Sequence, residues 1–184
     1  AVPATAELDY VFAVIPVNHS QDRWVARAEI RPGVRSVVHH VVAYVREKDD
    51  PWLRPGDTRR TTKSDILAVY TPGQPAMQCP EGMAKLLPAG ADIVLQLHYT
   101  PNGTPARDLT SLALTFTSPP SRRVHTLQLS TTNFVIPPGA ANHRVSVSGS
   151  MPNDALLLGF FPHLHLRGKA FEYDLIEPGG RVET

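Results

Sequence analysis

Five of the eight histidines in this chain stand in three short groups that could bind a metal ion. The groups are the adjacent pair His39 and His40, the single His98, and the pair His163 and His165. Neutral imidazole is a good ligand for copper, zinc, iron and nickel. Cys79 is the only cysteine, so a metal site built from several cysteines is excluded.

The adjacent histidines lie in the valine-rich run Val38-His39-His40-Val41, which is typical of a strand. Neighbouring side chains on a flat strand point to opposite faces, and an unpaired imidazole in the core is costly. Two interpretations follow. Either the strand bends or bulges so that both rings converge on one ion, or one ring is a satisfied core residue and the other is exposed. For an isolated pair the second arrangement is the more common one.

His98 stands near the end of an apolar run, just before the turn at 100–103. Alternation places it on the same face as Gln96 and Val94. A strand end beside a turn is a suitable position for a ligand, although a single histidine is more often structural.

His163 and His165 are two residues apart, so on a strand they point the same way and could hold one ion together. Leu164 and Leu166 should then pack on the opposite face. Cupins also use a His-x-His pair, usually followed closely by a glutamate. The first glutamate here is Glu172, which disfavours a cupin.

The remaining histidines, His19, His125 and His143, have no partner in the sequence, and we expect them at the surface or in turns. Cys79 cannot form an internal disulfide, and we expect it to be a small loop or core residue.

The elements that must position these residues are predicted to be strands. The chain has 18 prolines and 12 glycines, which exclude long helices and favour short strands joined by turns. The first series of predicted strands covers residues 10–17, 24–31, 36–47, 66–70, 92–100 and 112–117; the second covers 124–129, 143–148, 155–166 and 169–176. Residues 51–63 are predicted to form a loop, and residues 81–87 one short helical turn.

The proline-rich stretch 119–123 divides the predicted strands into two lobes. We therefore expect an all-β chain of two β-sandwich, jelly-roll-like lobes, 1–118 and 124–184. The second lobe is predicted to be incomplete, because about 60 residues are fewer than the ~100 of a usual sandwich. The first residue is not methionine and a new strand begins at 181–184, so we expect a segment of a longer protein.

Composition excludes several classes of partner. The net charge is 18 − 17 = +1, with no long basic run, so no nucleic acid is expected. No stretch approaches the ~20 apolar residues of a membrane span. The sequence indicates no particular oligomeric state.

Taken in order, these motifs resemble the copper type II, ascorbate-dependent monooxygenases, the family of peptidylglycine α-hydroxylating monooxygenase and dopamine β-monooxygenase. The resemblance extends over residues 10–176, and several connecting motifs are similar to the bacterial branch. The histidine motifs are Val38-His39-His40-Val41, Gln96-Leu97-His98-Tyr99 and Pro162-His163-Leu164-His165-Leu166-Arg167-Gly168-Lys169; the connecting motifs are Pro72-Gly73, Pro80-Glu81-Gly82-Met83-Ala84-Lys85, Leu87-Pro88-Ala89-Gly90 and Ile136-Pro137-Pro138-Gly139.

The resemblance implies two copper centres, one in each lobe. His39, His40 and His98 would bind the electron-donating copper, and His163 and His165 would supply two ligands of the oxygen-binding copper. The family's third ligand there is a downstream methionine. Met77, Met83 and Met151 do not match its position, so we expect it beyond residue 184.

The implied reaction hydroxylates a C–H bond of a small-molecule or peptide substrate, using O2 and a reductant such as ascorbate. An extracytoplasmic location is expected for such copper chemistry, and this segment alone should be inactive. Two other interpretations remain: a non-catalytic copper-binding or electron-transfer module, and a structural β-sandwich with incidental histidines.

Overall fold

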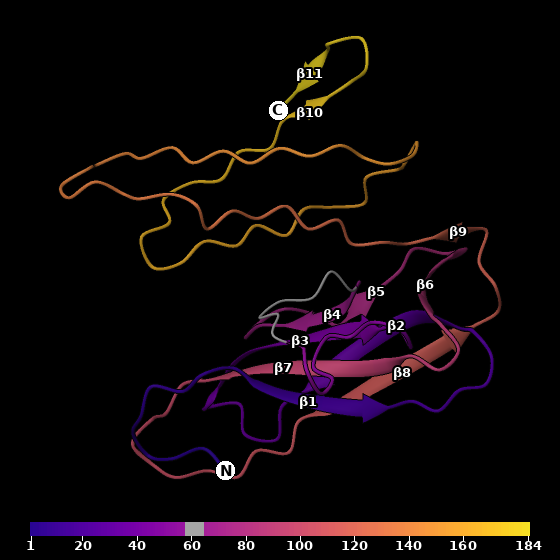
Figure 1. Cartoon of the computed structure of the whole chain (residues 1–184), viewed down its shortest axis with the longest axis vertical. Helices are drawn as coiled ribbons and strands as arrows, with labels where there is room; N and C mark the ends of the chain where they lie inside the picture. The colour runs from indigo at the N-terminus through magenta and orange to yellow at the C-terminus, as the bar shows by residue number, and fades with distance from the viewer. Residues whose placement is uncertain (58–64) are drawn as a thin grey trace. The chain divides into compact units, whose positions relative to one another are not determined.

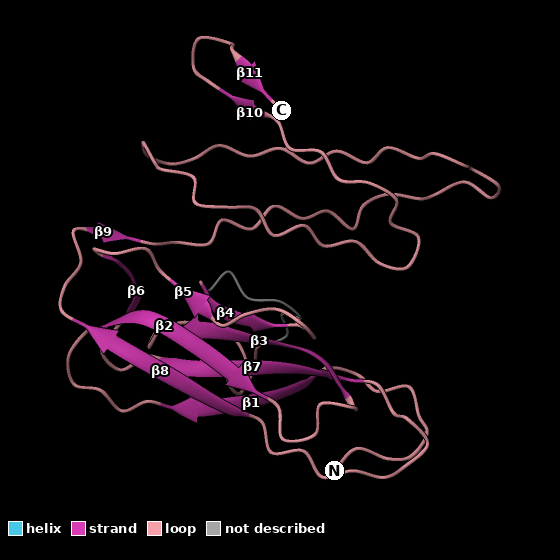
Figure 2. Ribbon diagram, turned by 180° about the vertical axis from the view of Figure 1, so that it is seen from behind, coloured by secondary structure: helices cyan, strands magenta, loops and turns pink. Residues whose placement is uncertain are grey.

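The computed structural model describes residues 1–57 and 65–184, which form strands, turns and extended segments (Figures 1 and 2). None of the described residues is helical, so the all-β prediction is confirmed. The described chain accordingly offers no long apolar helix that could cross a membrane. It divides into two compact units, Ala1–Gln128 and Leu129–Thr184.

The first sheet of the first unit carries two of the three histidine groups. Its strand order is β1-β7-β3-β4, and every neighbouring pair is antiparallel. The strands are β1 (Val11–Pro16), β7 (Asp92–Tyr99), β3 (Val38–Arg46) and β4 (Ile66–Tyr70). Each lies within one of the predicted strand ranges, 10–17, 92–100, 36–47 and 66–70.

The second sheet is built around β2 (Arg23–Arg31), which pairs with three other strands. The order is β5-β2-β6-β9, with β8 also on β2; the strands are β5 (Met77–Gln78), β6 (Met83–Leu87), β9 (Arg122–Arg123) and β8 (Ser111–Thr117). The predicted helical turn at 81–87 is wrong, because residues 83–87 form β6. The residues just before β6 form a tight turn, in which the Met83 amide donates to the Pro80 carbonyl oxygen at 3.1 Å.

One apolar core joins the two sheets. It contains Val25, Ala28 and Ile30 of β2, Leu87 of β6, and the inward residues of β3, β4 and β7; those residues are Val38, Val41, Ala43, Val45, Leu67, Ala68, Ile93, Leu95 and Leu97. Burying a side chain of the size of Leu87 or Leu67 contributes about 1.5–3 kcal/mol. Along β7, Ile93, Leu95 and Leu97 alternate toward this core, whereas Val94 is buried in a second apolar cluster on the other face of the sheet.

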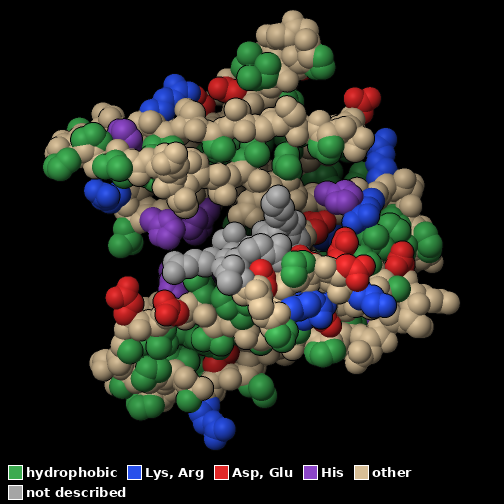
Figure 3. Space-filling view, viewed as in Figure 1, with side chains coloured by type: hydrophobic (Ala, Val, Ile, Leu, Met, Phe, Trp, Pro, Cys, Tyr) green, Lys and Arg blue, Asp and Glu red, His purple; other side chains and the backbone are tan. Residues whose placement is uncertain are grey.

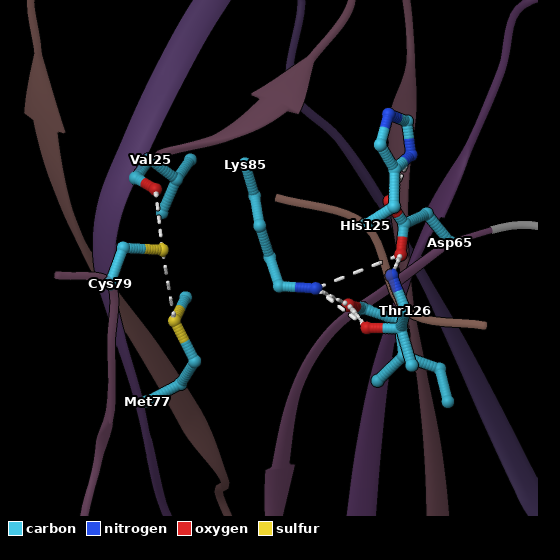
Figure 4. A network of polar contacts seen from close by, with 8 residues as sticks. Val25, Asp65, Met77, Cys79, Lys85, His125 and Thr126 are labelled. Atoms are coloured by element: carbon cyan, nitrogen blue, oxygen red, sulfur yellow. Dashed lines mark hydrogen bonds and ion pairs between the residues drawn. The ribbon is translucent and has the colours of Figure 1, made fainter. Parts of the chain in front are cut away.

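The segment that follows β9 belongs to the first unit and is held by a buried lysine (Figure 4). The Lys85 ammonium donates to the Ile66 carbonyl oxygen and to Thr126 Oγ1, both at 2.7 Å. The Thr126 amide in turn donates to Asp65 Oδ1 at 3.0 Å. Burial lowers the pKa of Lys85, and the nearby Asp65 carboxylate opposes that shift.

The predicted linker at 119–123 therefore lies within the first unit, where Arg122 and Arg123 pair with β6. Residues 51–57 form the predicted turns, and the rest of the predicted 51–63 loop lies outside the described residues.

The second unit contains far less regular structure than predicted. Its strands are the hairpin β10 (Leu175–Ile176) and β11 (Val182–Glu183). The predicted strands 143–148 and 155–166 have no ladder pairing, and of the predicted strand 169–176 only Leu175–Ile176 forms. Most of its large apolar side chains are exposed, among them Phe160 and Phe161. The predicted strands are absent here because strand pairing needs partners, and the described residues of this unit supply few.

Candidate metal centre

The candidate metal centre lies where β3 begins and β7 ends. His40 and His98 are directly opposite each other in the antiparallel register of these strands. Side chains at opposite positions share a face of the sheet. Because Val41 and Leu97 enter the core, His40 and His98 point to the other face of the same sheet.

A β-bulge brings His39 to the same face. The register is regular from Arg46 to His40 and then shifts, so that Val38 pairs with Tyr99 and His39 is the extra residue. An extra residue removes the strict alternation of side chains. The predicted bulge near His39 is thus confirmed, and the interpretation in which the two rings diverge to opposite faces does not hold.

The three rings converge. The Nδ1 atoms of His39 and His40 are 3.0 Å apart. Ring centroids are separated by 5.3 Å between His39 and His40, 4.9 Å between His39 and His98, and 5.0 Å between His40 and His98. One ring nitrogen of each histidine lies within 4.8 Å of the others.

These distances fit a shared ion. Two nitrogens that bind one metal ion through bonds of about 2.0–2.1 Å lie at most about 4.2 Å apart. The closest pair is already within that range, and the widest separation needs only a small rotation of the rings. Unlike two exposed histidines on a flexible loop, these rings are attached to paired strands, which limits the conformational entropy lost on binding.

The centre is open on one side and packed on the other. His39 is exposed, whereas His40 and His98 are half-buried. Histidine side chains are visible at the molecular surface (Figure 3). Further along the same face of the sheet, Tyr44, Trp52 and Val94 form a buried apolar cluster. An ion could therefore enter from solvent while the strands beneath it stay fixed.

Tyr10 is a neighbour of the centre that the sequence did not reveal. Its ring centroid lies 5.1 Å from that of His98 and 5.9 Å from that of His40. Tyr10 immediately precedes β1, which pairs with β7 on the side away from β3. Its contact depends on a pairing between residues distant in the sequence, and no local pattern indicates it.

Asp108 holds the turn that leads into the bulge. Its carboxylate accepts hydrogen bonds from the Val34 amide at 2.8 Å, the Tyr99 hydroxyl at 3.0 Å and the Thr110 hydroxyl at 2.6 Å. Partial burial alone would raise the pKa of Asp108, but these hydrogen bonds lower it overall. The carboxylate thus ties the residues before β3 to the end of β7.

Gly33 allows the same turn to pass close to the backbone of Leu109. A Cβ atom there would lie 2.8 Å from the backbone nitrogen of Leu109, which is too short for any side chain. Glycine at this position and Asp108 beside it together place the chain so that β3 starts at the bulge.

The second predicted histidine pair lies in the second unit. The ring centroids of His163 and His165 are 5.1 Å apart, and both residues are exposed. Leu164 and Leu166 are exposed as well, so the prediction that they pack on the opposite face is wrong. The segment carries no ladder pairing that would provide such a face.

Within the described residues, His39, His40 and His98 form the only group of three or more histidine, cysteine or acidic side chains close enough to share an ion. His19 contacts Phe116, His125 lies 3.4 Å from Asp65, and His143 is exposed. Cys79 is half-buried beside Met77, with 3.7 Å between the two sulfur atoms.

Neither the models of known protein families nor the curated protein sequences contain a match to this chain. The assignment of a function therefore depends on the geometry of the histidine centre and on the motif resemblance.

Removing one of the converging histidines should abolish most metal binding. In a calorimetric titration with Cu(II), we expect one ion per chain, and His98→Ala should weaken binding by more than about 100-fold, since even an outer-shell partner contributes 10–100-fold. His143→Ala is the matched control, and His163→Ala should also change little. Equal losses from His98→Ala and His163→Ala would contradict this asymmetry.

The hydrogen bond from the Tyr99 hydroxyl to Asp108 can be tested through the pKa of Tyr99. Burial, and then the hydrogen bond to Asp108, raise the pKa of Tyr99 to about 12. Asp108→Asn should lower the pKa of Tyr99 toward the ordinary value of about 10, because a neutral amide stabilises the protonated phenol less than a carboxylate does. NMR titration of the tyrosine rings measures this pKa, and the Tyr99→Phe variant identifies which ring signal belongs to Tyr99. An unchanged Tyr99 pKa in the variant would show that Asp108 does not hold it.

Proposed function

We propose that the first unit binds one copper ion through His39, His40 and His98 and uses it to pass single electrons. On this proposal the chain is part of a copper-dependent monooxygenase, in which His163 and His165 supply two ligands of a second copper. Copper supplies one-electron chemistry, because it alternates between Cu(I) and Cu(II).

The observation that carries the proposal is the bulge at His39. Three imidazoles meet on one face only because the register shifts between Val38 and His40. Adjacent histidines in a regular strand would diverge. A structural role for the histidines does not require such a shift, whereas a shared ion does.

The donor set favours copper among the metals that imidazole binds. Cu(II) is the most strongly bound of the divalent first-row ions by nitrogen ligands. Zinc is the principal competitor, since three histidines also form zinc sites. The exposed edge at His39 suits a redox role, because a reductant in solution can approach the centre directly.

In the complete reaction, one oxygen atom of O2 would enter a substrate C–H bond and the other would leave as water, with two electrons and two protons supplied by the reductant and solvent. The motif resemblance supports this chemistry and a reductant such as ascorbate. The contribution of the first unit's own residues is to hold the electron-donating ion and to leave one side of it open.

A non-catalytic copper-binding or electron-transfer module is the second candidate. It is favoured by one observation: a group of three ligating side chains is present in the first unit, whereas His163 and His165 stand as a pair among the described residues. The two candidates differ in oxygen consumption with a substrate, but they share the redox-active centre.

The copper-loaded chain should undergo one complete redox cycle at this centre. We expect the Cu(II) electron paramagnetic resonance signal, close to one spin per chain, to disappear on anaerobic addition of ascorbate and to return when O2 is admitted. His98→Ala carried through the same steps and desalted should show little signal at the start. A protein-bound signal that ascorbate does not reduce would contradict an electron-donating role, and tighter binding of Zn(II) than of Cu(II) would contradict the choice of metal.

A further inference from the structure

A small hollow lies away from the histidine centre, between β2 and the end of β4. Its volume is about 210 Å³, and its lining includes residues 27–31 of β2, Arg35, Tyr70 and Gln74. We call the set Arg27, Arg31, Arg35, Tyr70 and Gln74 the arginine groove. Val69 and Tyr70 of β4 line the groove, as does Ala28, a residue of the core.

The groove has an excess of positive charge. Three guanidinium groups line it, and Glu29 is the carboxylate among the lining residues. Glu29 is held by Arg27 at 3.2 Å and by Arg31 at 2.8 Å. The formal charge is therefore 3 − 1 = +2, in a chain whose total is +1.

The groove also has an excess of hydrogen-bond donors. Glu29 already accepts three hydrogen bonds, one from Arg27 and two from Arg31. The hydrogen bond from Arg31 helps lower the pKa of Glu29, so the carboxylate stays charged. The side-chain oxygen of Gln74 accepts from the Thr71 hydroxyl at 2.8 Å, which leaves the amide NH2 of Gln74 as a donor.

Arg35 is the guanidinium that this network leaves available. The described residues provide it with no ion pair within bonding distance, although it is close enough to Glu29 to help lower the pKa of that carboxyl. Arginine recognises carboxylates and phosphates through two parallel N–H donors. A pocket with surplus donors, surplus positive charge and saturated acceptors is complementary to an anion.

We propose that the arginine groove binds a small oxyanion with two or more negative charges, with Arg35 as its principal partner. The groove is smaller than the roughly 300–1,000 Å³ of pockets for drug-sized ligands, so the anion must be small. A di- or tricarboxylate and inorganic phosphate share the required chemistry.

This groove is separate from the histidine centre, but two of its residues flank β3, the strand that carries His39 and His40. Arg35 precedes His39 by four residues, and Tyr70 pairs with Val41, the residue after His40. An anion held between Arg35 and Tyr70 would therefore bridge the two ends of the segment that contains the bulge. Binding can be measured on the metal-free chain, so failure of this inference and failure of the copper proposal are distinguishable.

The test is calorimetric titration of the metal-free full chain with citrate and, separately, with phosphate, at an ionic strength held constant with NaCl. We expect at least one of the two to bind with one site per chain, and the tighter one to identify the source of the oxyanion. Arg35→Gln should weaken binding at least about fivefold. Arg107→Gln removes the same charge from an exposed position outside the groove and should leave the affinity within about twofold.

The Glu29→Gln variant tests the inference through the direction in which the anion affinity changes. Removing the competing carboxylate frees Arg27 and Arg31 and should tighten binding at least about threefold, whereas a purely structural ion-pair ladder would gain nothing from the change. Near-ultraviolet circular dichroism of each variant confirms folding. The inference is overturned if neither anion binds, if Arg35→Gln and Arg107→Gln lose affinity equally, or if Glu29→Gln binds no more tightly than the unsubstituted chain.

Discussion

The one-residue register shift between β3 and β7 is the feature on which the candidate metal centre depends. Without it, strict alternation would turn His39 to the opposite face from His40, which is the core face where Val41 is buried. Burying an imidazole there would cost more free energy than its packing returns. With the shift, three side chains from two paired strands meet on one face, and the cost of ordering them is met when the sheet forms rather than when an ion binds.

The surroundings of the bulge explain why it forms at this position. Gly33 and Asp108 fix the turn before β3, and Tyr99, clamped by Asp108, ends β7 opposite Val38. On the far side of the bulge the register is regular because alternate residues of β3 and β7 enter one core. The extra residue has to be absorbed between these two fixed regions, which is where His39 stands.

Much of the first unit could be predicted from local patterns, because β1, β3, β4 and β7 are apolar runs, β2 and β8 alternate polar and apolar residues, and glycine or proline punctuates many of the connections. The sequence left open whether the rings of His39 and His40 converge with His98 or point to opposite faces, because register depends on pairing between distant strands. Tyr10 was missed for the same reason. The predicted turn at 81–87 became a strand because Ala84 and Leu87 complete the core, and tertiary burial outweighs local propensity. In the second unit, apolar runs alone did not suffice, because runs without pairing partners do not become strands.

The most direct test of the shared-ion claim is a crystal structure of the copper-loaded chain with anomalous data collected at the copper absorption edge. The account predicts one strong peak bound by a ring nitrogen from each of His39, His40 and His98, with Val38 opposite Tyr99 and His40 opposite His98 as in the sheet described above. A peak elsewhere, or a regular β3 in which the His39 ring turns away from the other two, would contradict it.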